Sequence, residues 1–164
     1  MHEAVGPAWL VWLEGSAVAM AMRQWVWLYP IVEIVHIIGF VILVGAAAMF
    51  DLRLLGLSRQ LPVADLAQHL LRWARLSLLL VIPSGFLMFM AHATEMAELP
   101  AFRLKLLLIV AAGLNAAMFH RGPLKSVGNW NQYVAIPVTA KVAAVLSLVL
   151  WVGVIACGRL LAYL

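Results

Sequence analysis

Charged residues are scarce in this chain of 164 residues, and their scarcity is the first guide to its class. Asp, Glu, Lys and Arg make up 11% of the sequence, against about 25% in soluble globular domains. Hydrophobic residues make up 66%, and the mean hydropathy is +1.03. This composition excludes an ordinary soluble domain and predicts an integral membrane protein with a single domain.

Several chemical signatures are also missing. Cys157 is the only cysteine, so no disulfide can form within the chain. The sequence has no glycine-rich phosphate loop, no Cys-x-x-Cys pair and no nucleophile with a base at helical spacing, which leaves hydrolases and nucleotide enzymes without support. His2 and Glu3 stand where a signal peptide would be basic, so we expect the N-terminus to be retained. The net charge of +4 comes from cations beside apolar segments and does not indicate a nucleic-acid partner.

Four apolar stretches are long enough for a helix to cross a bilayer, which takes about 20 residues. We expect spans at about 29–50, 70–91, 102–120 and 137–157, so that residues 29–164 form a transmembrane domain. Residues 1–28 are predicted to be an interfacial segment, with a helix from Ala17 to about Trp25 and exposed aromatic residues. Pro83-Ser84-Gly85 predicts a kink in the second span. The predicted fold is an all-α four-transmembrane-helix bundle with a short N-terminal interfacial helix.

The distribution of cations predicts the orientation. The connection between the first two spans and its flanks carry Arg53, Arg59, Arg72 and Arg75, which is more positive than the opposite side. Under the positive-inside rule this side faces the cytoplasm, and both termini then lie on the outer side.

Glu33 and His36 interrupt the first span and share one helix face, because they are three residues apart. Ionisable groups within a span usually face the protein interior. Lys105, on the third span, is the expected partner of Glu33. Asn115, on the same span, is expected to link helices through a hydrogen bond. Together the three residues form a predicted buried polar network. The network is either purely structural or an entry point for protons or electrons beside His36. Asp51 is expected to pair with a nearby arginine, whose candidates are Arg53, Arg72 and Arg75.

Four histidines are candidate haem ligands, because helical bundles hold haem between histidines on facing helices. His36 lies deepest and is the first candidate, and His92, at the end of the second span, is the second. His69 and His120 lie near headgroup level and are weaker candidates. A buried histidine paired with Glu33, and interfacial histidines without a special role, are the alternatives. A copper path remains open through the irregularly placed methionines Met88, Met90, Met96 and Met118.

A longer pattern surrounds these residues, Trp27-Leu28-Tyr29-Pro30-x-x-Glu33-x-x-His36-x-x-Gly39 followed by Asp51-Leu52-Arg53-Leu54-Leu55-Gly56. Together with Phe102-x-x-Lys105 and Ala112-Gly113-x-Asn115, it resembles a family of small bacterial inner-membrane proteins of unknown function. The helix of His36 is also remotely similar to the first helix of the copper-resistance D type of membrane protein and of membrane-bound protoporphyrinogen oxidase, which implies a haem role for His36.

These features favour a membrane protein that binds haem b and passes electrons between the haem and a quinone or an outer-face redox protein. The first alternative is a non-enzymatic membrane subunit or scaffold, which includes a homo-oligomer. A carrier of copper or protons is the second. The resemblance implies the bacterial inner membrane as the location, and the sequence leaves open whether the protein is an enzyme.

Overall fold

The protein is described from a computed structural model, which covers residues 6–161 and 163, so the expectations for the first five residues lie outside the described part. Helices account for all the regular secondary structure in that part, and it contains no strand. The elements are α1 (Ala8–Glu14), α2 (Ala17–Gln24), α3 (Leu28–Leu55), α4 (Val63–Ala91), α5 (Ala93–Glu98), α6 (Pro100–Arg121), the 3₁₀ helix η1 (Pro123–Asn129) and α7 (Val138–Leu160).

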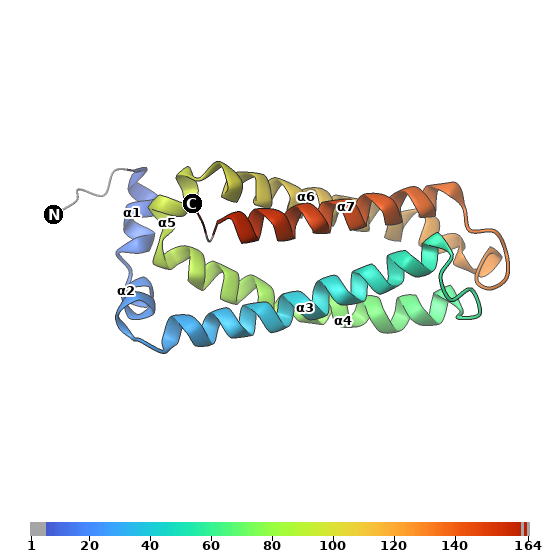
Figure 1. Ribbon diagram of the computed structural model, residues 1–164, viewed down its shortest axis with the longest axis horizontal. Coiled ribbons are helices and arrows are strands. Elements are labelled where there is room, and N and C mark those ends of the chain that lie inside the picture. The colour runs from blue at the N-terminus through green and yellow to red at the C-terminus, as the bar shows by residue number, and fades with distance from the viewer. Residues whose placement is uncertain (1–5, 162, 164) are drawn as a thin grey trace.

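Four of these helices are long and apolar enough to cross a membrane. Helices α3, α4, α6 and α7 contain 28, 29, 22 and 23 residues and run side by side (Figure 1). At about 1.5 Å per residue, each exceeds the roughly 30 Å of a bilayer's hydrocarbon core. The predicted all-α bundle with four candidate membrane spans is therefore confirmed.

Helix α3 continues beyond the end of its apolar run. It stops at Gly56, which adopts the left-handed conformation with φ of 113° and donates its N–H to the carbonyl of Arg53. The N–H of Leu57 bonds the carbonyl of Leu52, which completes the glycine-dependent C-terminal cap. The extra turn carries Asp51 into the buried part of the bundle.

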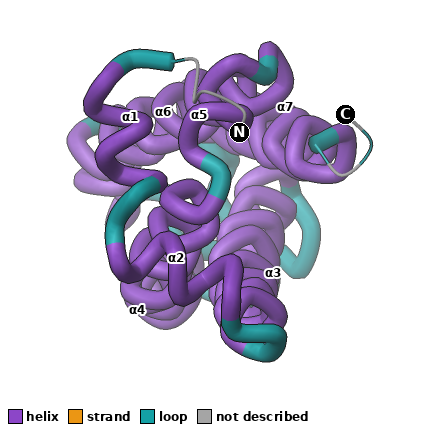
Figure 2. Tube along the Cα trace, turned by 90° about the vertical axis from the view of Figure 1, so that its left-hand side faces the viewer, coloured by secondary structure: helices purple, strands orange, loops and turns teal. Residues whose placement is uncertain are grey.

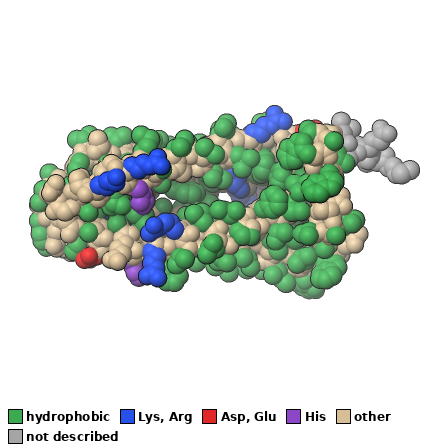
Figure 3. All heavy atoms as spheres, turned by 180° about the vertical axis from the view of Figure 1, so that it is seen from behind, with side chains coloured by type: hydrophobic (Ala, Val, Ile, Leu, Met, Phe, Trp, Pro, Cys, Tyr) green, Lys and Arg blue, Asp and Glu red, His purple; other side chains and the backbone are tan. Residues whose placement is uncertain are grey.

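The bundle consists of two hairpins joined along one side. Helix α3 packs against α4, α6 packs against α7, and the contact between α3 and α7 joins the two pairs. Figure 2 shows the pair α3 and α4 on one side of the bundle and the pair α6 and α7 on the other. Among the described residues no Cα atom of α4 comes within 8 Å of one in α6. The space-filling view shows a hollow along the bundle (Figure 3).

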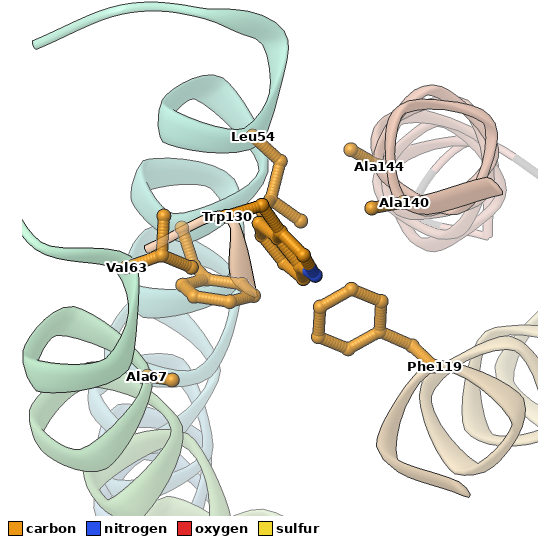
Figure 4. Close-up of a cluster of buried hydrophobic side chains, with 8 residues drawn as sticks. Leu54, Val63, Ala67, Phe119, Trp130, Ala140 and Ala144 are labelled. Atoms are coloured by element: carbon orange, nitrogen blue, oxygen red, sulfur yellow. The ribbon is translucent and has the colours of Figure 1, made fainter. Parts of the chain in front are cut away.

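The main apolar core lies at the η1 end, where all four long helices meet. Trp130, which follows η1, is 3% exposed and lies among side chains of the long helices (Figure 4). The buried members of this cluster are Phe50, Leu54, Val63, Ala67, Phe119, Trp130, Ala140 and Ala144. The connection before α7 is thus anchored in the core through Trp130.

Helices α1, α2 and α5 cover the other end of the bundle (Figure 1). Ser16 caps α2 by accepting a hydrogen bond from the N–H of Ala19 at 3.3 Å. Glu14 of α1 accepts hydrogen bonds from the backbone N–H and the hydroxyl of Thr94 in α5. Arg23 of α2 donates to the carbonyl oxygens of Glu14 and Ala91, so the N-terminal helices are tied to the end of α4.

Exposed tryptophans surround these short helices, as a membrane-interface segment requires. Trp9, Trp12, Trp25 and Trp27 are between 62% and 75% exposed. Indole rings favour the headgroup level of a bilayer, so this arrangement suits the predicted interfacial segment.

Candidate functional site

The candidate site is centred on His36, which is half-buried in α3 and faces α4. Its Nδ1 atom lies 3.2 Å from the carbonyl oxygen of Val81 and 3.0 Å from Oγ of Ser84. The hydroxyl of Ser84 also contacts the carbonyl oxygens of Leu80 and Val81 in its own helix. A histidine on one helix is therefore hydrogen-bonded to a short segment of the next, beside Pro83.

This network assigns the tautomer of the ring. A carbonyl oxygen can only accept, so Nδ1 must carry the hydrogen that points at Val81. The Ser84 hydroxyl then accepts from Nδ1 and donates to the carbonyl of Leu80. In the neutral imidazole, Nε2 consequently keeps its lone pair, and no hydrogen bond to Nε2 occurs among the described residues.

Two glycines make this close packing possible. A Cβ atom on Gly39 would lie 2.9 Å from Cβ of Leu80, so α3 and α4 pack closely about one turn from His36. A Cβ atom on Gly85 would lie 3.0 Å from Cε1 of His36. Larger residues at either position would displace the ring from α4.

The charged groups around His36 differ in part from the expectation. Lys105 is half-buried in α6, and its ammonium lies beside Gly158 of α7. Lys105 and Glu33 are near enough to act electrostatically on the His36 ring. Glu33 is exposed, however, and no ion pair joins it to Lys105 in the part of the chain that the structure describes. The expected burial of Glu33 is thus wrong, because its side chain points out of the bundle.

The other three histidines lie away from His36. His92, at the end of α4, has its ring edge-on to Tyr29 at 6.2 Å, and its Nδ1 lies 3.9 Å from Glu95. His69 is exposed on α4, and the Nδ1 atom of His120 bonds the carbonyl of Ala116 in its own helix at 2.8 Å. None of the three contributes a hydrogen bond or ring contact to His36 within the described residues.

Asn115 links the second hairpin. Its side-chain amide donates to the carbonyl oxygen of Ala143 at 2.9 Å, which joins α6 to α7. Such hydrogen bonds are the usual role of an amide within a span. Asn115 lies two to three turns along α6 from Lys105, so the two residues do not form one network.

The expected ion pair of Asp51 does not form. Arg53 donates instead to the backbone carbonyls of Leu61 and Arg59, and it thereby fixes the connection between α3 and α4. Asp51 is 6% exposed, and its Oδ2 has no hydrogen-bond partner among the described residues. The arginine beside it in sequence is taken up by the loop, which explains the incorrect prediction.

No group of three or more His, Cys, Asp and Glu side chains that would suit a metal ion occurs in the described residues. The chemistry that the arrangement offers is an oriented imidazole with a lone pair on Nε2, close to a half-buried ammonium group.

Sequence reasoning missed the residues that hold His36. The run Pro83-Ser84-Gly85 indicated only a kink, although the serine bonds the imidazole and the glycine gives it room. A serine and a glycine directly after a mid-span proline were the available signal, since proline removes a helix hydrogen bond and leaves carbonyl groups that a hydroxyl can contact.

The fold and the spans define an integral membrane protein of the multi-pass, all-α class. Residues 9–164 match the model of the family of unknown function DUF6644, and the chain belongs to that family. The expected membership of a family of unknown function is thereby confirmed. Comparisons with curated proteins and with solved structures found no match.

Proposed function

We propose that this protein binds a b-type haem in the membrane through Nε2 of His36. The observation that carries the proposal is the hydrogen bonding of Nδ1 to Val81 and Ser84. Histidines that bind metals almost always donate their other ring N–H to a carbonyl or carboxylate, which fixes the ring and makes the ligating nitrogen more basic. His36 has this arrangement and lies within a candidate span.

One residue, His36, would hold the haem iron. His92, the predicted second ligand, lies against Tyr29 and Glu95 and would have to leave both to approach His36. The proposal therefore rests on His36 alone. Lys105 on the facing hairpin offers a cation for a propionate.

A bound haem would supply one-electron transfer, for which we propose a quinone or an outer-face redox protein as partner. The chain's own residues orient the group. Ser84 and Val81 hold the imidazole in place through its Nδ1 atom. Burial in apolar surroundings is one of the factors by which proteins set a haem potential.

An absorption spectrum tests the proposal. The protein is expressed with haem supplied, purified, and measured before and after reduction by dithionite. We expect Soret and α bands in the wild type, and their loss in His36→Ala. The matched control is His69→Ala, which removes an exposed histidine and should leave both bands unchanged. Fully recovered wild-type protein without these bands would overturn the proposal, as would an unchanged spectrum in His36→Ala.

A non-enzymatic membrane subunit is the second candidate, and the same hydrogen bonds favour it. His36 joins α3 to α4, and Asn115 joins α6 to α7, so both groups can serve only to fix helix packing. In that case His36→Ala lowers thermal stability without the loss of any cofactor. His36→Gln, whose amide can still donate to Val81, should restore much of that stability but no haem absorption.

A further inference from the structure

Cations without acidic partners gather at the η1 end of the bundle. Arg72 and Arg75 extend from α4, Arg121 ends α6, and Lys125 lies in η1. All four side chains are exposed, and the ion pair found among the described residues, between His92 and Glu95, involves none of them. Figure 3 shows Lys, Arg and His side chains on both sides of the hollow at this end.

A cavity of about 360 Å³ lies at this end of the bundle, and Arg75 is the one of these four cations that lines it. Its walls come from α4 on one side and from α6 and η1 on the other, and they include Ala64, Ala67, Leu71, Arg75, His120 and Val127. Most of these side chains are apolar, and Arg75 and His120 supply polar groups from opposite walls. The Nε atom of Arg75 bonds the carbonyl of Leu71 at 3.1 Å, so its two terminal amino groups are without a protein partner in the described chain.

Helices α4 and α6 have no pair of Cα atoms within 8 Å among the described residues, and Figure 3 shows a hollow along the bundle between the two hairpins. Asp65 lies with Gln68, His69 and Arg72 at a neighbouring depression, and Gln68 also lines the cavity. The cavity itself is lined by Arg75 and, within the described chain, by no acidic side chain, and the rest of its lining is mostly apolar.

We propose that this groove binds an anionic phospholipid, with its phosphate at the guanidinium group of Arg75 and one acyl chain between α4 and α6. Basic pockets between transmembrane helices are known to take acidic lipid headgroups. A guanidinium presents paired N–H groups that match phosphate oxygens, and the exposed Arg72, Arg121 and Lys125 add attraction for a net negative headgroup. The occupant has an anionic head and an apolar tail, as the groove has a cationic mouth and apolar walls.

Lipid binding by the whole purified protein in detergent tests this proposal, with native mass spectrometry as the readout. The probes are phosphatidylglycerol and phosphatidylcholine with the same acyl chains, and glycerol phosphate without chains. We expect the wild type to retain phosphatidylglycerol more strongly than phosphatidylcholine, and to bind glycerol phosphate least. Arg75→Gln should lower the affinity for phosphatidylglycerol about fivefold, the effect of one cation at a membrane surface.

Two matched controls remove a cation from the same end of the bundle but outside the cavity. Arg59 lies in the connection between α3 and α4, Lys141 lies in the first turn of α7, and both are exposed. Arg59→Gln and Lys141→Gln should keep the wild-type preference. Arg75→Lys should keep part of it, because the charge remains while the paired N–H groups are lost.

Three results would overturn the proposal. The first is equal retention of the two phospholipids by the wild type. The second is a loss in Arg59→Gln as large as that in Arg75→Gln, which would indicate general surface charge. The third is binding of glycerol phosphate as strong as that of the lipid, which would leave the apolar groove without a role. The elution profile of each variant in size-exclusion chromatography separates loss of binding from loss of fold.

Discussion

Alanine at position 39 tests the contact that sets the spacing of α3 and α4. A Cβ atom on Gly39 would lie 2.9 Å from Cβ of Leu80 and 2.9 Å from Cγ2 of Val81. The Leu80 atom is fixed to its backbone and cannot rotate away, so the helices must separate to admit the methyl group. Because His36 bonds α4 about one turn away, its contacts with Val81 and Ser84 should lengthen as well.

Two opposing effects determine how much Gly39→Ala changes the free energy of unfolding. Overpacking of a close contact costs about 1–3 kcal/mol, whereas glycine to alanine within a helix gains up to about 1 kcal/mol. Gly39→Ala should therefore destabilise the protein by about 1 kcal/mol. Gly45 lies in the same helix, and a Cβ atom added there would have no neighbour within 4 Å. Gly45→Ala should therefore show only the gain in stability from replacing glycine within a helix. The two variants should differ by about 2 kcal/mol.

Unfolding of the purified protein in mixed micelles, with increasing sodium dodecyl sulfate, measures this difference. Gly153→Ala should fall between the two variants, because its added Cβ meets the flexible end of Leu108, the Cδ1 atom, at 2.9 Å. If Gly39→Ala is as stable as Gly45→Ala, α3 and α4 do not pack closely at Gly39. The explanation of how His36 reaches α4 would then be wrong.

Three further substitutions test other parts of the molecule. Burial raises the pKa of Glu14, but the hydrogen bonds from Thr94 and nearby positive charges outweigh it and hold the pKa below its ordinary value of 4.5. A depressed carboxyl pKa stabilises the folded protein above pH 4.5, and this stability is lost as the pH falls through the folded-state pKa. Thermal stability measured at decreasing pH should show this loss in the wild type but not in Glu14→Gln. Asp51→Asn should keep the fold and raise stability by about 1 kcal/mol in the micelle assay, because it removes a buried acid with an unpartnered oxygen; a loss of several kcal/mol would contradict this. Asn115→Leu should cost about 1 kcal/mol in the same assay, the loss of one hydrogen bond between spans, and an unchanged midpoint would show that this bond contributes nothing.

The sequence was sufficient for the fold class because each span is a long apolar run, and length and hydropathy decide such helices almost alone. It was insufficient where a polar side chain bonds backbone groups distant in sequence. Arg53 satisfies loop carbonyls, including that of Asn131 at 3.5 Å, and the side chain of Asn131 caps α4 through the N–H of Ala64 at 2.8 Å. No local pattern contains those pairings, so Arg53 was taken, with Arg72 and Arg75, as a candidate partner of Asp51.

At the candidate site, too, the sequence predicts the position of a residue better than its partners. The depth of His36 follows from its position in an apolar run, whereas its partners depend on which helix lies beside it. Residues three apart on a helix differ by about 60° in direction. This angle is large enough for His36 to face α4 while Glu33 points out of the bundle, so a shared face in sequence did not mean a shared environment.

The two proposed ligands would occupy the bundle at different levels. Leu71 at the lipid cavity and Ser84 at the imidazole are separated by about 20 Å along α4, beyond the range in which effects on stability usually couple. Each ligand binds only the folded protein and should raise its thermal stability by mass action. Measured together, the shifts from phosphatidylglycerol and from haem should add within about 0.5 kcal/mol. A haem effect that disappears when the lipid is present would instead mean that both ligands compete for the single space between α4 and α6, and that the hairpins close on one occupant at a time.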